Sequence, residues 1–102
     1  MPPADLTWYV YMLRCADGSL YTGIATDLAR RLDEHNGDDR LGARYTRGRR
    51  PVTLVYAEAA PNRAAACRRE HAIKRLDRRS KQAMAAGWSA RTLPRDGSSA
   101  TV

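Results

Sequence analysis

Two short runs of apolar and aromatic residues near the N-terminus, separated by a turn, constrain the fold more than any other stretch of this chain. Residues 8–15 (WYVYMLRC) are apolar at both alternating positions, which predicts a strand that is buried on both faces. Residues 19–25 predict a second strand, and Asp17-Gly18 between the runs is typical of a hairpin turn. The chain is therefore expected to be built around an antiparallel pair of strands.

The length of the hairpin loop decides which side chains share a face. A two-residue Asp17-Gly18 loop would place Tyr11 and Tyr21 on opposite faces of the sheet. A three-residue loop over residues 16–18, with Gly18 in the left-handed region, would place both tyrosines on one face. The local residues permit both loops.

The segment after the hairpin predicts a helix that is capped by Thr26 or Asp27 and stops at Gly37. At about 100° per residue, Arg31 and His35 fall on its inner stripe, where leucines are expected. One interpretation is structural: Arg31 extends along the apolar surface to solvent, and His35 stabilises the helix C-terminus. The other is that both residues belong to a functional site. The predicted inner stripe is Leu28, Arg31, Leu32 and His35, and the predicted outer side is Arg30, Asp33 and Glu34.

The charge of the chain indicates a partner that carries phosphate. Its 102 residues have a net charge of +7, and all but two of the 18 basic residues are arginines. Such an excess of positive charge favours nucleic acid, and the planar guanidinium group suits bidentate phosphate contacts. Biased codon usage is an alternative explanation for the arginine-to-lysine ratio, but it does not explain the net charge.

Several other classes of protein are not indicated. The two cysteines lie far apart and match no zinc spacing. The N-terminal residues lack the pattern of a signal peptide, and the longest apolar run, residues 8–13, is far shorter than the roughly 20 residues that span a bilayer. We therefore expect a cytoplasmic protein with reduced thiols and no membrane segment.

Residues 37–51 (GDDRLGARYTRGRRP) predict a loop with at most one short helical turn. Arginines alternate there with Tyr45, a pattern that suits contacts to a phosphate backbone and stacking on a base. A solvated, mobile basic loop is the alternative. The arginines of this segment are Arg40, Arg44, Arg47, Arg49 and Arg50.

The remaining chain completes a single α/β domain of the α+β type, with a three-stranded antiparallel sheet flanked by helices. Pro61-Asn62 is expected to break the chain and cap the next helix. The predicted inner side of that helix is Ala65, Ala66, Arg69, Ile73 and Leu76, with Glu70 on its flank. The predicted segments are a flexible lead-in over 1–6, the domain over 7–87 with a strand over 52–58 and helices over 63–76 and 80–86, and a disordered tail over 88–102.

Several of these residues occur in the order and spacing of a known family signature. Residues 9–11 (YVY) and 21–23 (YTG) match two tripeptides, and the last tyrosine of the first precedes the first tyrosine of the second by ten residues. Arg31 follows after ten more residues, His35 follows one helical turn later, and Glu70 lies on a later helix. Together they resemble the GIY-YIG nuclease domain over about residues 7–85, in particular its small stand-alone bacterial members of the UPF0213 type.

The resemblance implies roles for these side chains in cleaving a phosphodiester bond. Glu70 would hold one Mg²⁺ or Mn²⁺ ion, and Arg31, which has no obvious local acid as a partner, would bind the scissile phosphate. Tyr11, as general base, and Tyr21 would surround the attacking water, and His35 would either assist proton transfer or orient a partner. A phenol titrates near about 10, so Tyr11 would need positive charge nearby to act at neutral pH.

The same resemblance favours the three-residue hairpin loop, because both tyrosines must face one cleft. Each residue also has a structural interpretation: Glu70 and Lys74 are spaced as a helix-surface ion pair, and tyrosines are common in cores. The sequence departs from the family at Tyr9, where a glycine is usual, and at Thr22, where an isoleucine is usual. The expected nucleic-acid-binding residues are Arg44, Tyr45, Arg47, Arg49, Arg50 and Lys74.

Two hypotheses for the function follow. The first is a metal-dependent endonuclease that hydrolyses DNA, with repair or recombination structures as substrates and no small-molecule cofactor. The second is a nucleic-acid-binding module, for DNA or RNA, that keeps the fold without catalysis. A third class, an RNA-processing or ribosome-associated accessory protein, adds to these two, because a phosphate-binding arginine does not by itself distinguish DNA from RNA.

Overall fold

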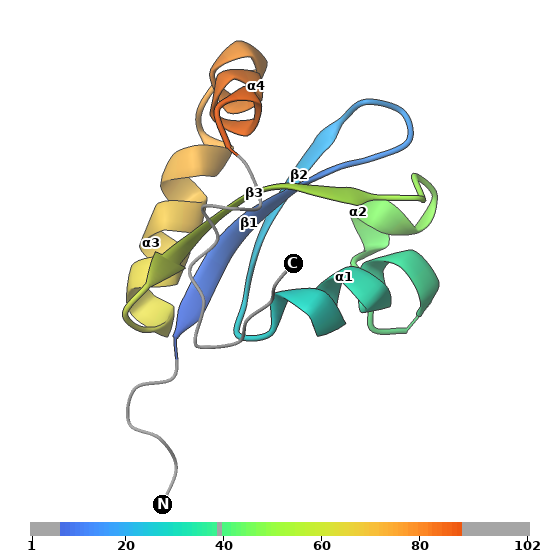
Figure 1. Ribbon diagram of the computed structural model, residues 1–102, viewed down its shortest axis with the longest axis horizontal. Helices are drawn as coiled ribbons and strands as arrows, with labels where there is room; N and C mark the ends of the chain where they lie inside the picture. Colours follow the sequence, from blue (N-terminus) through green and yellow to red (C-terminus); the bar gives the residue numbers. More distant parts are fainter. Residues whose placement is uncertain (1–6, 39, 89–102) are drawn as a thin grey trace, which may run out of the picture.

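The computed structural model describes residues 7–38 and 40–88, and it confirms the predicted three-stranded antiparallel sheet with flanking helices. The predicted lead-in over 1–6 and nearly all of the predicted tail over 88–102 lie outside the described residues. The strand order is β2-β1-β3, so the first strand is central (Figure 1). The elements are β1 (Trp8–Arg14), β2 (Leu20–Ala25), α1 (Leu28–Gly37), α2 (Arg44–Arg47), β3 (Thr53–Ala60), α3 (Arg63–Lys74) and α4 (Arg78–Ala86).

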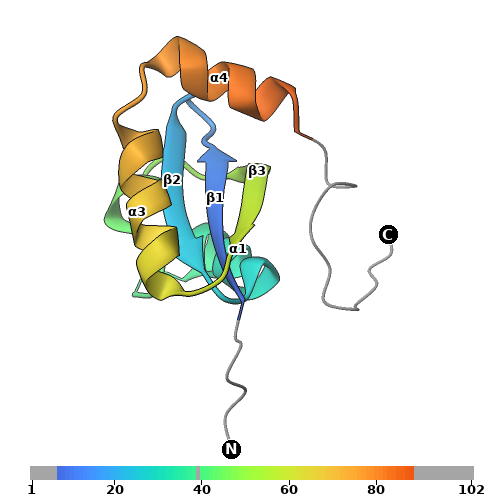
Figure 2. The same ribbon diagram turned by 90° about the vertical axis from the view of Figure 1, so that its left-hand side faces the viewer.

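The central strand β1 is apolar on both faces because helices cover the sheet on both sides (Figures 1 and 2). Val10 and Met12 are fully buried on one face, where Ile73 of α3 packs against them. Leu13 faces the opposite side, where the leucines of α1 cover it. Burying one such aliphatic side chain contributes about 1.5–3 kcal/mol, so β1 fixes the sheet and both helical layers together.

The hairpin between β1 and β2 has the three-residue loop. The backbone N–H of Cys15 donates to the carbonyl of Ser19 at 2.8 Å, and Gly18 has a φ of +86°. Tyr11 therefore lies opposite Gly23, and Leu13 lies opposite Tyr21. Because side chains alternate along a strand, this register places Tyr11 and Tyr21 on the same face, as the sequence predicts for this loop.

The third strand, β3, extends two residues further toward the C-terminus than predicted. It was expected over residues 52–58, but it runs over Thr53–Ala60, and its last two alanines pair with Tyr9 and Trp8. Alanine is disfavoured in strands, so the composition gave no reason to extend the strand past Glu58. Pairing with the central strand outweighs this low strand propensity.

The two C-terminal helices differ from the prediction at three points. Helix α3 ends at Lys74, so Leu76 lies beyond it and is exposed rather than on its inner side. Arg69, also expected on the inner side, is 45% exposed and pairs with Glu58 of β3 at 2.8 Å instead of packing in the core. Helix α4 begins at Arg78 because Asp77 caps it by accepting a hydrogen bond from the backbone of Ser80. Within residues 7–38 and 40–88, no helix is long and apolar enough to cross a bilayer.

Candidate functional site

The candidate site lies at the edge of the sheet formed by β2. Tyr11 comes from the central strand, Tyr21 from β2 itself, and Arg31 and His35 from α1, which covers the same face. Helix α3, which carries Glu70, covers the opposite face and packs along both β1 and β2, as Figure 2 shows. The two layers can therefore contribute to one site only around the β2 edge.

Gly23 on β2 provides the space through which Tyr11 reaches this edge. A Cβ atom at Gly23 would lie 2.5 Å from the Tyr11 hydroxyl oxygen and 2.7 Å from the ring carbon that bears it. Both distances are well below van der Waals contact. The glycine that ends the second tripeptide thus lets the Tyr11 ring lie directly across the edge strand.

Tyr11 is the first member of a buried hydrogen-bonded chain. Its hydroxyl group lies 2.9 Å from Nε2 of His35, which is fully buried on the inner face of α1. The other ring nitrogen of His35, Nδ1, lies 2.9 Å from the hydroxyl oxygen of Thr46 on α2. Thr46 is also fully buried, and it donates to the carbonyl of Ala43 at 3.0 Å. The chain thus fixes the orientation of Tyr11 from two helices.

Burial sets the protonation of Tyr11 and His35. It raises the pKa of Tyr11 to about 12, although the nearby guanidinium group of Arg31 acts in the opposite direction. Burial also lowers the pKa of His35 to about 4, and the positive charge of Arg31 adds to this shift. Both side chains are therefore neutral at pH 7. The positive charge expected to lower the pKa of Tyr11 is present, but burial outweighs it.

Tyr21 lies in a cluster of rings beside this pair. Its ring centroid is 5.2 Å from that of His35 and 6.4 Å from that of Tyr11. On α2, Tyr45 stacks on it at 5.8 Å with an interplanar angle of 29°. Tyr11 and Tyr21 therefore share one site, and Tyr45 connects it to the surface.

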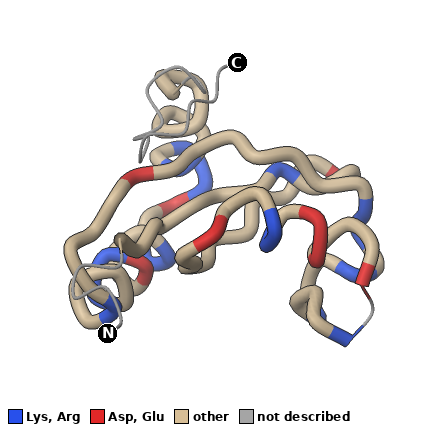
Figure 3. The backbone as a smooth tube through the Cα atoms, turned by 60° about the horizontal axis from the view of Figure 1, so that its bottom comes forward, with Lys and Arg blue, Asp and Glu red and all other residues tan. Residues whose placement is uncertain are grey.

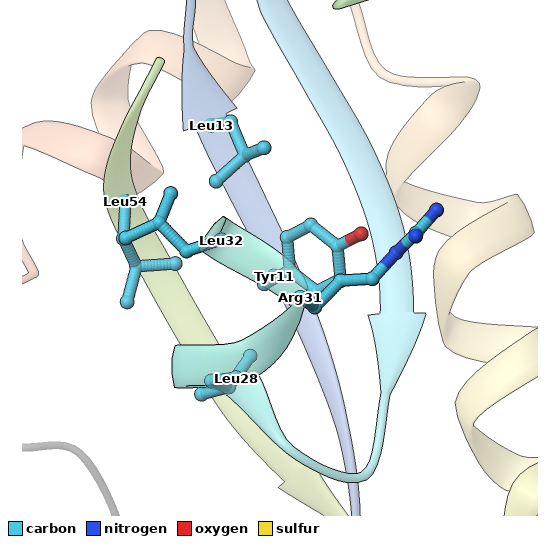
Figure 4. Close-up of a pocket in the computed structure, with 6 residues that line it drawn as sticks. All are labelled: Tyr11, Leu13, Leu28, Arg31, Leu32 and Leu54. Atoms are coloured by element: carbon cyan, nitrogen blue, oxygen red, sulfur yellow. The ribbon is translucent and has the colours of Figure 1, made fainter. Parts of the chain in front are cut away.

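Arg31 points toward the same place. The sequence indicated that it lacks a local acidic partner, but in the structure its guanidinium group is paired. Figure 4 shows its side chain and the Tyr11 hydroxyl group directed away from the leucines that line the small apolar pocket beside them. Its guanidinium group donates to Glu34 at 2.8 Å and to the carbonyl of Leu41. Glu34, predicted on the outer side of α1, has a mostly buried side chain that is 19% exposed. The three-residue spacing on a helix brings the carboxylate alongside Arg31.

Glu70 is directed into the molecule rather than into bulk solvent. Its side chain is only 16% exposed, and its negative charge contributes to the raised pKa of Tyr11 across the β2 edge. It also forms the predicted ion pair with Lys74 at 3.2 Å. No group of three or more acidic, histidine or cysteine side chains that could hold a metal occurs in the described part of the chain. A metal here would therefore have Glu70 as its principal protein ligand.

The basic segment after α1 is held in place by hydrogen bonds. Arg49 pairs with Asp17 of the hairpin loop at 3.1 Å, and its guanidinium group lies 4.1 Å from the centre of the Tyr45 ring. Arg50 donates from Nε to the carbonyl of His35 at 2.6 Å and therefore caps the end of α1. Arg44 and Arg47 of α2 are exposed. Each of the four helices contains basic residues, and Figure 3 marks the Lys and Arg positions of the described chain in blue.

Sequence reasoning missed three residues that shape the site: Glu34, Asn36 and Thr46. Asn36 bonds both backbone groups of Val52, at 2.7 and 3.0 Å, and so joins α1 to the start of β3. Thr46 and Asn36 each act across more than ten positions of sequence, which no local pattern reveals. The three-residue spacing of Glu34 from Arg31 was visible in the sequence. Because Glu34 was predicted to lie on the outer side of α1, its pairing with Arg31 was not expected.

Comparisons with known proteins identify the family of this chain. The model of the GIY-YIG catalytic domain matches residues 7–83. A UPF0213 protein of Desulfotalea psychrophila is 59% identical over 69 residues, which cover 68% of this chain and 62% of that protein. A UPF0213 protein of Halobacterium salinarum is 50% identical over 76 residues, covering 74% of this chain and 96% of that protein.

Solved structures give the same assignment. The solution NMR structure of a UPF0213 protein from Bacillus halodurans is similar with a TM-score of 0.50 and 45% identity, over 78% of this chain and 83% of that one. The solution NMR structure of a protein from E. faecalis has a TM-score of 0.52 and 37% identity, over 78% and 84% of the two chains. The chain therefore belongs to the GIY-YIG family of nuclease domains, among its small UPF0213 members.

Proposed function

We propose that this protein is a divalent-metal-dependent endonuclease that hydrolyses phosphodiester bonds in DNA, with repair or recombination structures as its substrates. The proposal is carried by Tyr11, Tyr21 and Arg31, which share one face of the sheet beside β2, and by Glu70 of α3, whose mostly buried carboxylate contributes to the raised pKa of Tyr11. A protein that only bound phosphate would have no use for a carboxylate there. The two free cysteines agree with the cytoplasm as the place of action.

Arg31 supplies the positive charge for the scissile phosphate. In the free protein its guanidinium group is bonded to Glu34 and to the Leu41 carbonyl. Two phosphate oxygens offer the same planar, bidentate pairing as a carboxylate. A bound phosphate would therefore take over donor groups that Glu34 holds at rest, and Arg31 would stabilise the charge that develops on the phosphoryl oxygens.

Tyr11 and His35 together accept the proton of the attacking water. Because burial raises the pKa of Tyr11 to about 12, a preformed phenolate is disfavoured. Instead, the water gives its proton to the Tyr11 oxygen while the Tyr11 proton moves along the 2.9 Å hydrogen bond to Nε2 of His35. The resulting hydroxide forms the new P–O bond, and the bond to the leaving oxygen breaks with its electron pair on that oxygen, which takes a proton from solvent.

The residues present fit a single hard cation that is bound mainly through water and phosphate. Mg²⁺ is often held by only one or two carboxylates, with water and substrate phosphate as the other ligands, and Glu70 offers one mostly buried carboxylate. When bound, the ion would neutralise charge on the phosphoryl oxygens and lower the pKa of bound water. Lys74, which pairs with Glu70 in the free protein, would turn toward the nucleic-acid backbone.

The exposed arginines of α2, Arg44 and Arg47, are the proposed backbone contacts next to the site. Tyr45 is 40% exposed, but its ring already contacts Tyr21 and the Arg49 guanidinium group. A base would therefore stack on this assembly from outside. Arg50, which caps α1, would contribute its charge from a fixed position.

A nucleic-acid-binding module without catalysis is the second candidate. Two observations favour it: Tyr11 rests as a neutral phenol, and the guanidinium group of Arg31 is already paired with Glu34. In this case the basic surface would bind DNA or RNA with strong salt dependence, and no bond would be cut.

Incubation with labelled branched, nicked and linear DNA, with and without Mg²⁺ or Mn²⁺, distinguishes the two candidates. We expect metal-dependent cleavage by the wild type and a loss of about 100-fold or more in Arg31→Ala and Glu70→Ala. Arg30→Ala is the matched control, because Arg30 neighbours Arg31 but is 72% exposed on the outer side of α1. Cleavage that neither Arg31→Ala nor Glu70→Ala reduces would contradict the catalytic assignment. Salt-sensitive binding without cleavage by the wild type would establish the binding module.

A further inference from the structure

Thr46 is a fully buried polar residue with no role in the chemistry described so far. It lies on the single turn of α2, between the exposed arginines Arg44 and Arg47. Its hydroxyl oxygen is 3.0 Å from the carbonyl of Ala43 and 2.9 Å from Nδ1 of His35. The hydroxyl group has one proton and two such neighbours, so its orientation determines which nitrogen of His35 carries a proton.

The Tyr11 hydroxyl group decides between the two tautomers of His35, one protonated at Nδ1 and the other at Nε2. Its acceptor in the described part of the chain is Nε2 of His35, at 2.9 Å, and Tyr11 is only 2% exposed. When Nδ1 carries the proton, it donates to Thr46, Thr46 donates to the Ala43 carbonyl, and Nε2 accepts from Tyr11. Tyr11, His35 and Thr46 then each donate to an acceptor within the protein. Of the donors around His35 among the described residues, only the backbone N–H of Ala43, 3.5 Å from Nδ1, lacks one.

The opposite tautomer gives up the shorter hydrogen bond, the 2.9 Å contact of the Tyr11 hydroxyl group, in order to accept from the Ala43 N–H at 3.5 Å. With the proton on Nε2, His35 would donate to the Tyr11 oxygen, and the Tyr11 hydroxyl group would lose its acceptor. Thr46 would turn its proton to Nδ1, while the Ala43 carbonyl would keep the backbone N–H groups of Thr46 and Arg47, at 3.1 and 3.2 Å. A buried hydroxyl group without an acceptor is unfavourable, so the arrangement with Nδ1 protonated is preferred.

We propose that Thr46 is a positioning residue that holds His35 in the Nδ1–H tautomer, so that Nε2 is the acceptor of the Tyr11 proton. The tautomer assignment stands on the geometry of the free protein, and only its catalytic consequence rests on the proposed function. Burial lowers the pKa of His35 to about 4, so the imidazole is neutral at pH 7 and a single tautomer can be defined. In the proposed reaction, the wrong tautomer would direct a proton at Tyr11 and block its transfer to His35.

The chain contains a group that would enforce the wrong tautomer if Thr46 lost its hydroxyl. The backbone N–H of Ala43 points at Nδ1 of His35 from 3.5 Å, too long for a strong hydrogen bond while Thr46 is present. Thr46→Val keeps the shape of the side chain and leaves this N–H as the nearest polar neighbour of Nδ1. The proton then moves to Nε2. Thr46→Ser keeps the hydroxyl group and should keep the wild-type tautomer.

Nitrogen NMR of the full chain, without nucleic acid, tests the proposal. In the ¹⁵N-labelled protein at pH 7, long-range proton–nitrogen correlations distinguish a protonated ring nitrogen from an unprotonated one. The chain has two histidines, and substitution of the exposed one, His71→Gln, assigns the signals of His35. We expect a protonated Nδ1 in the wild type and in Thr46→Ser, and a protonated Nε2 in Thr46→Val.

Cleavage assays then test the catalytic consequence. We expect Thr46→Val to cleave about 10- to 100-fold more slowly, as is typical when a group that orients a reacting side chain is removed, and Thr46→Ser to stay within a few-fold of the wild type. A protonated Nε2 in the wild type, or an unchanged tautomer in Thr46→Val, overturns the proposal. If Thr46→Val does not fold, the wild-type spectrum still decides. If the expected tautomers are found but no DNA is cut, the proposed function fails and the tautomer assignment stands.

Discussion

At the scale of single residues, the site depends on how closely Tyr11 approaches the edge strand. The Tyr11 ring crosses β2 at Gly23, where even a methyl group would meet the hydroxyl oxygen at 2.5 Å. The hydroxyl group then lies 2.9 Å from Nε2 of His35, and the charge of Glu70 contributes to its raised pKa. A glycine in the second tripeptide is therefore required by the path of a side chain on the neighbouring strand, since Gly23 itself has no positive φ.

Gly23→Ala should consequently damage both stability and activity. We expect it to lower the free energy of unfolding by about 1–3 kcal/mol, as overpacking in a filled site does, and to displace the Tyr11 ring from His35. Urea unfolding measures the stability, and the NMR signals of His35 report the displacement. Gly48→Ala is the matched control, because nothing lies within 4 Å of a Cβ atom at Gly48. Equal stability of the two variants would contradict the close approach.

His35 should make the stability of the protein depend on pH in a defined window. Burial lowers its pKa from 6.5 to about 4, so between these values the unfolded chain binds a proton that the folded protein does not. The free energy of unfolding is therefore independent of His35 above pH 6.5 and falls as the pH drops toward 4, by about 3 kcal/mol in total.

Urea unfolding at pH 7, 6 and 5 measures this dependence. His35→Gln should lose most of the decrease over this range, whereas His71→Gln, which removes an exposed histidine, should keep it. A wild-type stability that is the same at pH 7 and pH 5 would mean that His35 is protonated in the folded state without penalty.

At the scale of elements, the segment between α1 and β3 is held against the site rather than being a mobile basic loop. Asn36 at the end of α1 bonds both backbone groups of Val52, and Thr46 of α2 bonds His35. Arg49 joins the same segment to Asp17 in the β1–β2 loop. Helix α2 therefore presents its exposed arginines from a fixed position beside the candidate site.

Asn36→Ala should release this segment. It leaves the N–H and C=O groups of the buried Val52 without their side-chain partner, and we expect a loss of about 1–3 kcal/mol in the free energy of unfolding. Hydrogen exchange of the Val52 amide should speed up as well. Asp33→Ala, an exposed position on the same helix, is the control and should change neither quantity. If the two variants behave alike, the segment is held by other contacts.

At the scale of the whole molecule, the sheet separates two helical layers, which come close to each other at its β2 edge. Helix α1 and helix α3 cover opposite faces, and the site forms where β2 ends the sheet between them. Helices α2, α3 and α4 each carry more basic than acidic residues, whereas Asp33 and Glu34 balance the two arginines of α1. This distribution would attract a polyanion from several directions, while the geometry of the β2 edge would decide where a bond is cut.

The sequence predicted the fold well because most of its determinants are local. The apolar run of β1, the Asp17-Gly18 turn and the cap at Asn62 each act within a few residues. The ends of β3 and α3 were misplaced because pairing and packing with distant elements set them. The pairing of Arg31 with Glu34 depends on the rotamers of both side chains, and the hydrophobic periodicity of a helix does not specify rotamers. The contact of Thr46 with His35 depended on the path of a loop.

In the proposed reaction, side chains from different layers act in one chemical step, and a double-substitution cycle in single-turnover DNA cleavage measures their coupling. Tyr11→Phe removes the hydroxyl group on the α1 side, and Glu70→Gln removes the carboxylate charge on the α3 side. Tyr56→Phe is the matched control, because its hydroxyl group bonds Glu58 of the same strand, β3, away from the site. We predict that each site variant cuts about 100-fold or more slowly than the wild type, and that the double variant is little slower than the slower single one. Losses that multiply in full, or cleavage by either single variant at the rate of Tyr56→Phe, would contradict a shared step at the β2 edge.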